Sequence, residues 1–308
     1  MTFVRGGCAA WIVCGSLWAT HLAAGARTLA LPPEDEALVG STTTVSARYE
    51  DTLPDIARAH EVGYEAIVAA NPGVDRWLPG AGTPIVVPTE HILPDAPRTG
   101  VVLNLPEFRL YHYHAPAPGA PARVSTYPVS IGDVDWRTPL GLTRVVSKVK
   151  RPSWYPPASI RAEHARDGNV LPAVVPPGPD NPLGEYALRL AVPGGYLIHG
   201  TNKPYGIGMR VTHGCVRLYP EHIARLYREL PVGTPVRIVD QPIKAGWKDG
   251  VLYLEVHAPL AESRTESGAT AAVRAVIAAT KRRDAAIDWD AVTRAARERR
   301  GVPVPVSR

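Results

Sequence analysis

The stretch Val101-Val102-Leu103-Asn104-Leu105-Pro106-Glu107-Phe108-Arg109-Leu110-Tyr111-His112 predicts two short β-strands, joined tightly at Leu105-Pro106-Glu107. Alternating residues continue through Thr126–Ile131, and a turn at Thr138–Gly141 precedes a further strand over residues 143–149. Because so many short strands are separated by turn residues, we expect a mainly β fold. Its core, over residues 98–240, should be a sandwich or barrel-like structure with one or few helices.

Three further features complete this domain. Residues 152–183 are dense in proline, which predicts a long surface loop that forms a wall or lid of a cleft. A helix is expected over Pro220–Leu230, because proline is favoured in a first helical turn. A strand over Pro235–Val239 follows it.

Residues 43–88 predict a separate small module. A short strand at Val45–Arg48, a helix after Asp51-Thr52-Leu53-Pro54, a second helix over Tyr64–Ala70 and a closing strand at Pro84–Pro88 follow in order. This order resembles the LysM module, a fold that binds glycans containing N-acetylglucosamine. Glu50 stands where that family usually has glycine. The alternative interpretation is a structural helix-turn-helix spacer.

The first 26 residues have the pattern of an export signal. Arg5 is the only charged residue in them, an apolar run covers Cys8–Trp18, and small residues stand at Ala24 and Ala26. The apolar run is shorter than the roughly 20 residues that a transmembrane helix needs. We therefore expect cleavage near Ala26 rather than an uncleaved anchor helix, and no transmembrane span in the exported protein.

The C-terminal part of the sequence contains no candidate catalytic residues. A strand pair around Asp249-Gly250 forms an extension over residues 241–260, and residues 261–308 predict a helical or partly disordered tail. The net charge of +5 is too small to indicate a nucleic-acid partner. In the tail, the residues expected to share apolar helix faces are Val273, Val276 and Ile277 in one helix, and Trp289, Val292 and Ala296 in a second that Asp288 would cap.

The cysteines point to the candidate site. Once the signal is removed, Cys8 and Cys14 are lost and Cys215 has no disulfide partner in its own chain. Cys215 lies in the run Val211-Thr212-His213-Gly214-Cys215-Val216-Arg217, and His199 ends an apolar stretch upstream. Thiol chemistry needs a thiolate, a base, and donors for a developing oxyanion.

The residues around Cys215 can supply these groups. His199 and His213 are both candidate bases, and backbone N–H groups at Gly214 and Cys215 are candidate oxyanion donors. On an extended chain His213 and Arg217 lie on the same side as Cys215, and the guanidinium fork suits a carboxylate. Cys215 could instead be a small buried apolar residue. A zinc site made by both histidines and Cys215 lacks a fourth ligand at a convincing spacing, so we expect neither metal nor cofactor.

Several separated motifs resemble the L,D-transpeptidase catalytic domain of the YkuD type. They are Ile198-His199-Gly200-Thr201-Asn202, Gly206-Ile207-Gly208 and Thr212–Arg217, supported by Ile131-Gly132 with Thr138–Gly141 and by Pro152–Ile160. The resemblance covers about residues 98–240, and Pro242–His257 is similar to the extra segment of the Gram-negative, ErfK/YbiS-like branch. Thr212 replaces a commoner serine.

This resemblance implies a reaction on peptidoglycan in the periplasm. Cys215 would attack the carbonyl at the L-centre of diaminopimelate in a tetrapeptide stem and release D-alanine. An amine would then resolve the thioester, either from another stem, giving a 3→3 cross-link, or from the lysine terminus of an outer-membrane lipoprotein. Hydrolysis by water and a non-catalytic wall-binding protein are the competing interpretations.

The same resemblance implies roles for the neighbouring residues. His213 would be the base, and His199 with the Gly200 backbone would line the site and orient the substrate. From the sequence alone the two histidines could exchange roles. The residues expected to contact substrate are Arg217, Thr212 and Asn202. A LysM module would raise the local concentration of stems by holding their glycan strand.

Overall fold

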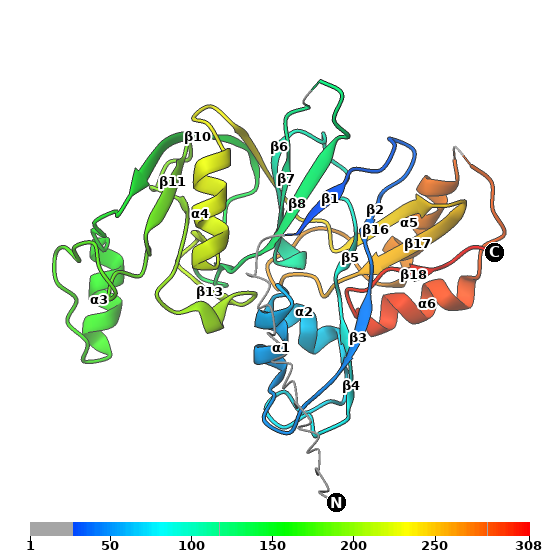
Figure 1. Cartoon of the computed structure of the whole chain (residues 1–308), viewed down its shortest axis with the longest axis horizontal. Coiled ribbons are helices and arrows are strands. Elements are labelled where there is room, and N and C mark those ends of the chain that lie inside the picture. The colour runs from blue at the N-terminus through cyan, green and yellow to red at the C-terminus, as the bar shows by residue number, and fades with distance from the viewer. Residues whose placement is uncertain (1–26, 117, 282) are drawn as a thin grey trace, which may run out of the picture.

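The computed structural model describes residues 27–308 except 117 and 282, so the expected signal segment lies outside the described residues. The fold is mainly β, as predicted, and the described residues contain six α-helices. No helix in the described part of the chain is long and apolar enough to cross a membrane. In Figure 1, α4 lies against the large sheet, the small module of α1 and α2 lies below the sheet, and the C-terminal helices α5 and α6 lie at the right.

The large sheet has nine strands in the order β1-β8-β7-β6-β15-β10-β11-β12-β14. The β6–β15 and β12–β14 pairs are parallel, and the other neighbours are antiparallel. The strands are β1 Thr28–Ala30, β6 Gly100–Asn104, β7 Arg109–Tyr113, β8 Arg123–Pro128, β10 Gly141–Lys150, β11 Tyr186–Leu190, β12 Leu197–His199, β14 Val216–Arg217 and β15 Pro235–Val239. A separate parallel pair joins β9, Ile131–Gly132, to β13, Arg210–Thr212.

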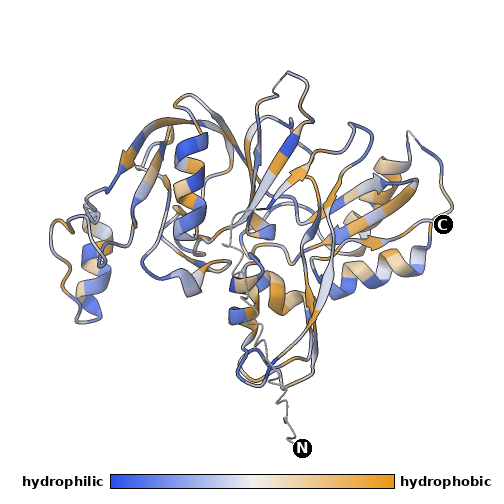
Figure 2. Cartoon of the chain, viewed as in Figure 1, coloured by the Kyte–Doolittle hydropathy of each residue, from blue (hydrophilic) through white to orange (hydrophobic). Residues whose placement is uncertain are grey.

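Helix α4, Pro220–Glu229, supplies its apolar residues to the core of this sheet. Ile223 and Leu226 are buried there with strand residues such as Leu103, Leu188 and Ile198. Figure 2 shows hydrophilic and hydrophobic residues sharing α4, as expected for a helix that covers a core. The tight connection between β6 and β7 is a 3₁₀ turn, Leu105–Glu107.

The proline-rich segment holds a helix that the sequence did not predict. Helix α3, Ala158–Arg166, follows directly after Pro156 and Pro157, and an isolated bridge joins Trp154 to Val175 at its base. Only Ile160 of the helix is buried. It therefore lacks the apolar stripe by which a helix is recognised in sequence.

The N-terminal module contains the four predicted elements: β3 Thr43–Ser46, α1 Leu53–Ala59, α2 Tyr64–Ala70 and β4 Pro84–Val87. β3 pairs antiparallel with β4, and Leu53, Ile67 and Ile85 are fully buried between strands and helices. Thr52 caps α1, because its hydroxyl accepts from the Asp55 amide while the Asp55 carboxylate accepts from the Thr52 amide. A small sheet of β2, Leu38–Gly40, and β5, Glu90–Ile92, flanks the module.

Residues 243–306 share one core, which differs from the division into a strand extension and a separate tail. Strands β16 Ile243–Lys248, β17 Val251–Val256 and β18 Val304–Pro305 form a sheet under α5, Ala269–Thr280, and α6, Trp289–Glu298. Leu252, Leu254, Val276 and Val292 are fully buried between them. Asp288 caps α6 as predicted, since its carboxylate accepts from the Ala291 amide at 2.9 Å.

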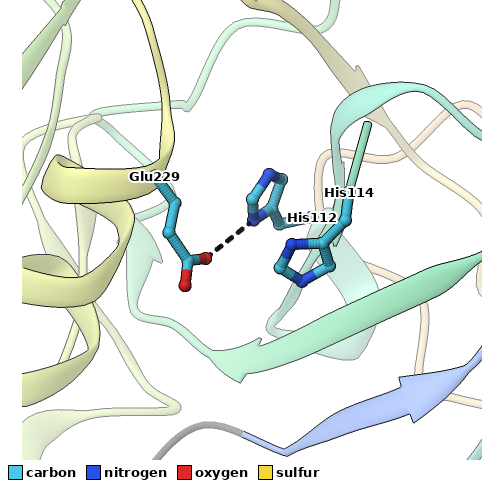
Figure 3. Close-up of side chains that lie close together, drawn as sticks. All are labelled: His112, His114 and Glu229. Carbon is cyan, nitrogen blue, oxygen red and sulfur yellow. Dashed lines mark ion pairs between the residues drawn. The ribbon is translucent and has the colours of Figure 1, made fainter. Parts of the chain in front are cut away.

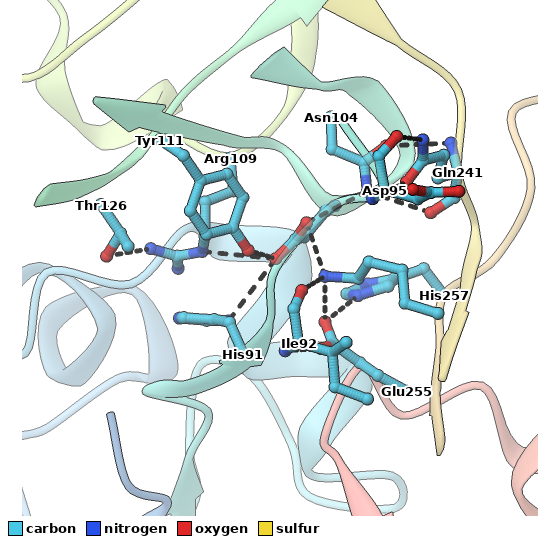
Figure 4. Close-up of polar contacts among 12 residues, drawn as sticks. His91, Ile92, Asp95, Asn104, Arg109, Tyr111, Thr126, Gln241, Glu255 and His257 are labelled. Atoms are coloured by element: carbon cyan, nitrogen blue, oxygen red, sulfur yellow. Dashed lines mark hydrogen bonds and ion pairs between the residues drawn. The ribbon is translucent and has the colours of Figure 1, made fainter. Parts of the chain in front are cut away.

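A buried polar network joins the large sheet to the C-terminal sheet and to β5 (Figure 4). The Lys244 ammonium lies 2.9 Å from a Glu107 carboxylate oxygen and 3.0 Å from a Glu255 oxygen, and it donates to the Ile92 carbonyl. The Tyr111 hydroxyl also donates to Glu107. Lys244 lowers the pKa of Glu255 against the opposing effect of burial. The buried Arg109 guanidinium adds a second cation, with Nε 3.9 Å from a Glu107 oxygen. Lys244 alone contacts both carboxylates, and it therefore joins the two sheets.

Candidate active site

The candidate nucleophile and a candidate base are brought together by two parallel strands. Ile198 of β12 pairs with Val216 of β14, and His199 pairs with Arg217. Because neighbouring strand residues face opposite sides, Ile198 and Val216 enter the apolar core while His199, Cys215 and Arg217 share the other face.

His199 is held by a backbone carbonyl. Its Nδ1 lies 2.7 Å from the Gly200 oxygen, and because a carbonyl only accepts, Nδ1 carries the proton and Nε2 is the basic nitrogen. Burial and the nearby Arg217 charge lower the pKa of His199 to about 3, against the opposing effect of the Gly200 and Leu183 carbonyls. The resting imidazole is therefore neutral.

Gly200 must be small to make this contact. Its amide donates to the Tyr186 carbonyl at 3.1 Å, and a Cβ atom would lie 3.1 Å from the Ile223 side chain and 3.3 Å from the Leu183 carbonyl. The Gly200 carbonyl is consequently fixed against the imidazole ring.

Cys215 is partly buried and is a free thiol. Burial raises the pKa of Cys215, although the Leu197 backbone and the Arg217 charge act in the opposite direction. The thiol therefore needs a base before it can act as a nucleophile.

Arg217 supplies positive charge to this face of the sheet. Its backbone exchanges two hydrogen bonds with Ser130, at 2.9 and 3.0 Å, which fixes the start of the side chain. The guanidinium Nε is buried and has no hydrogen-bond partner among the described residues. Burial lowers the pKa of Arg217, while Cys215 raises it.

The loop before Cys215 has a backbone that only glycine adopts easily. Gly214 has φ of +92°, and a Cβ there would lie 2.6 Å from the Tyr196 ring. The Thr138 hydroxyl donates to the Gly214 carbonyl at 3.0 Å, and the Thr212 hydroxyl donates to the Cys215 carbonyl at 2.6 Å. Thr212 was expected to contact substrate, but its hydroxyl forms a hydrogen bond within the loop itself.

His213 and Asn202 contact the proline-rich segment. His213 Nε2 lies 3.1 Å from a Glu163 carboxylate oxygen on α3, and its ring packs against Trp136 with centroids 5.0 Å apart. Asn202 is exposed and donates to the Pro179 carbonyl at 3.2 Å. Sequence reasoning did not identify Glu163 or Trp136. The motif that contains Thr138 was noticed, but its hydroxyl contact was not.

The small N-terminal module covers the loop between the two histidines. The amide of Tyr64 donates to the Ile207 carbonyl at 3.0 Å, and the amide of Glu65 donates to the Gly208 carbonyl at 3.3 Å. Arg58 forms an ion pair with Glu221 at the start of α4. The first amides of α2 have no acceptor within the helix, and carbonyls of the loop that leads to Cys215 accept their hydrogen bonds instead.

Comparison with known proteins gives consistent matches. Residues 98–238 match the L,D-transpeptidase catalytic domain, and residues 242–306 match the L,D-transpeptidase C-terminal domain. The Escherichia coli protein named "Probable L,D-transpeptidase YcfS" is 41% identical over 94% of this chain and 91% of its own length. The E. coli protein named "Probable L,D-transpeptidase YbiS" is 42% identical over 79% of each chain. The crystal structure of Mycobacterium tuberculosis L,D-transpeptidase 3 covers 67% of this chain and 92% of its own, with 16% identity and a TM-score of 0.33.

Proposed function

The chain belongs to the L,D-transpeptidase family of cysteine-dependent acyltransferases, and from that premise we propose that Cys215 carries the acyl group of a peptidoglycan stem. The donor is a tetrapeptide stem, attacked at the carbonyl of the L-centre of diaminopimelate. The acceptor is an amine, from a second stem or from the lysine terminus of an outer-membrane lipoprotein.

His199 is the base in this proposal, which reverses the role that resemblance gave to His213. The observation that carries it is the Nδ1 contact with the Gly200 carbonyl, on a strand that lies beside Cys215 in parallel register. The carbonyl fixes the tautomer and leaves Nε2 as the proton acceptor. His213 instead has Nε2 against Glu163, so that nitrogen is engaged by a carboxylate on α3.

The reaction then runs in two halves. His199 Nε2 takes the Cys215 proton as sulfur attacks the carbonyl, and the Gly214 and Cys215 amides stabilise the oxyanion. The C–N bond to D-alanine breaks, and the imidazolium returns its proton to the leaving amine. The acceptor amine next attacks the thioester, His199 takes its proton, and the thiolate leaves and regains that proton.

Arg217 contributes a cation for a stem carboxylate. Its buried, unpartnered Nε supports this role, because a buried guanidinium without a counter-charge is costly. A carboxylate bound there would offset the charge that disfavours the His199 imidazolium. Asn202 is a further candidate for substrate contact, since it is exposed beside the proline-rich segment.

The N-terminal module is proposed to be a LysM module that holds glycan strands. The order of β3, α1, α2 and β4 supports it, as do three exposed apolar side chains in the connecting loops, Tyr49, Trp77 and Leu78. An aromatic face suits the apolar face of a sugar ring. With residues 1–26 as an export signal, the enzyme would work in the periplasm on glycan-linked stems.

Mass spectrometry of purified disaccharide-tetrapeptide incubated with the enzyme tests the function. Loss of D-alanine with formation of 3→3 dimers is expected, and Cys215→Ala should abolish both. Trimmed tripeptides without dimers would identify hydrolysis instead, and no Cys215-dependent product would contradict the proposal. Addition of a lipoprotein peptide ending in lysine separates the two amine acceptors. Trp77→Ala should weaken binding to intact sacculi without preventing the reaction of soluble stems.

A further inference from the structure

Two histidines and a glutamate meet where the end of α4 faces β7, on residues with no role in the proposed reaction (Figure 3). His112 lies in β7, which ends at Tyr113, and His114 follows directly. Residues two positions apart on an extended chain have side chains on the same face. The His114 amide donates to the Arg123 carbonyl at 3.0 Å, which continues the pairing of β7 with β8. Glu229 is the last residue of α4. One ligand atom of each of the three residues lies within 4.8 Å of the others.

The His112 ring faces a carboxylate without forming a hydrogen bond. Its side chain is only 7% exposed, and Nδ1 has no hydrogen-bond partner among the described residues. Nδ1 lies 3.4 Å from a Glu229 oxygen. A buried nitrogen left in this way is costly unless something else binds it.

The distance of 3.4 Å between His112 Nδ1 and the Glu229 oxygen equals the distance between two ligand atoms on one metal ion. Tetrahedral zinc with bonds of about 2.1 Å places neighbouring ligand atoms about 3.4 Å apart. Imidazole nitrogens with a single carboxylate favour Zn²⁺ over Mg²⁺ or Ca²⁺, which prefer oxygen ligands. We propose that His112, His114 and Glu229 form a zinc-binding site, with water as the fourth ligand.

The surrounding residues can orient these ligands. His114 Nε2 lies 2.8 Å from the Ser125 hydroxyl, which leaves Nδ1 of that ring for the metal. Arg225 donates from Nε to the other oxygen of Glu229 at 2.7 Å, and it also contacts Thr28. Ligands of a metal are commonly held by such outer contacts.

The charges nearby limit the affinity. Arg225 and Arg123 are the cations that act on these histidines, and Glu229 is the counter-charge. We therefore expect binding in the micromolar range rather than the tighter binding of a site with several anionic ligands. A bound ion would join the end of α4 to β7. Because α4 follows β14 after only two residues, it would brace the helix next to the catalytic strand.

Calorimetric titration with Zn²⁺ tests the site, after dialysis of the whole protein against a chelator. The Cys215→Ala variant is the parent, so that the catalytic thiol cannot bind the metal. One equivalent should bind and raise the melting temperature. His114→Ala and Glu229→Gln should each weaken binding at least tenfold, while His164→Ala on α3, which removes another accessible histidine, should leave it unchanged.

Cobalt provides a readout of geometry. Co²⁺ in the same parent should give the intense visible absorption of a tetrahedral site, and Glu229→Gln should remove it. Circular dichroism of each variant checks that it is folded. The absence of stoichiometric binding, or binding that both His114→Ala and Glu229→Gln retain at full affinity, would overturn the proposal.

Discussion

Gly63 of the N-terminal module and Gly208 of the loop before Cys215 pack backbone against backbone. A Cβ atom on Gly208 would lie 2.4 Å from the Gly63 Cα and 2.3 Å from the Tyr64 nitrogen. No side chain fits between them. The module is therefore seated directly on the loop that connects the two site histidines.

Gly208→Ala is predicted to lift the module from this loop. The added methyl group clashes with Gly63, and alanine is also disfavoured at φ of +91°. We expect kcat/KM on soluble stems to fall about tenfold, a loss that a module acting only as a glycan anchor would not cause. Gly73→Ala is the matched control, because Gly73 has φ of +84° and nothing within 4 Å of its added Cβ. Equal activity of the two variants would contradict the prediction.

Substitution of the two histidines should separate their roles. His199→Gln removes the base and should lower the rate of Cys215 acylation by about 10²- to 10⁴-fold. His213→Gln removes the contact with Glu163 on α3 and should lower this rate by about tenfold or less, because a partly exposed polar contact contributes little. Stopped-flow acylation with a carbapenem measures both rates. A larger loss in His213→Gln would restore His213 as the base.

The pH dependence of alkylation of Cys215 should show that Cys215 and His199 are both uncharged in the resting enzyme. Because burial raises the pKa of Cys215 and lowers that of His199, the thiol stays protonated and the imidazole neutral around pH 7. The rate with iodoacetamide should therefore keep rising through the alkaline range, with its midpoint above the usual thiol pKa. Removing the cation in Arg217→Gln should raise that midpoint further. A plateau below neutral pH would indicate a preformed thiolate and contradict this prediction.

The local elements of the fold could be predicted, because they depend on nearby residues. The hairpin at Leu105–Glu107 and the helix from Pro220 carry their signals within a few positions. The order of the strands could not be predicted, because β15 inserts between β6 and β10 through contacts far apart in sequence. The buried faces of the two C-terminal helices were predicted only in part. Ile277 and Trp289 were expected on these faces but are 48% and 46% exposed, whereas Ala272 and Ala291 are buried.

The candidate site, like the fold, could be predicted only where its signals lie close together in the sequence. The motifs made Cys215 and His199 candidate site residues, because thiol chemistry needs both residue types. They did not separate His199 from His213, since that depends on which backbone carbonyl meets which ring nitrogen. Glu163 carried no signal, because α3 has only one buried residue. His112 ends a predicted strand, but His114 lies beyond that strand and the third partner, Glu229, lies on a helix far away in the sequence.

The buried network at Lys244 predicts a large loss of stability from one substitution. Lys244→Met would leave the Glu107 and Glu255 carboxylates buried without their ammonium, and breaking a buried pair in this way costs about 3–5 kcal/mol. Lys248→Met on the same strand is the control, because Lys248 pairs with Glu90 where its side chain is 33% exposed. That change should cost about 1 kcal/mol or less. Urea unfolding measures both. Similar losses in the free energy of unfolding for the two variants would contradict a special role for the Lys244 network. A large loss in Lys244→Met alone would support this network as a main polar connection between the C-terminal sheet and the large sheet.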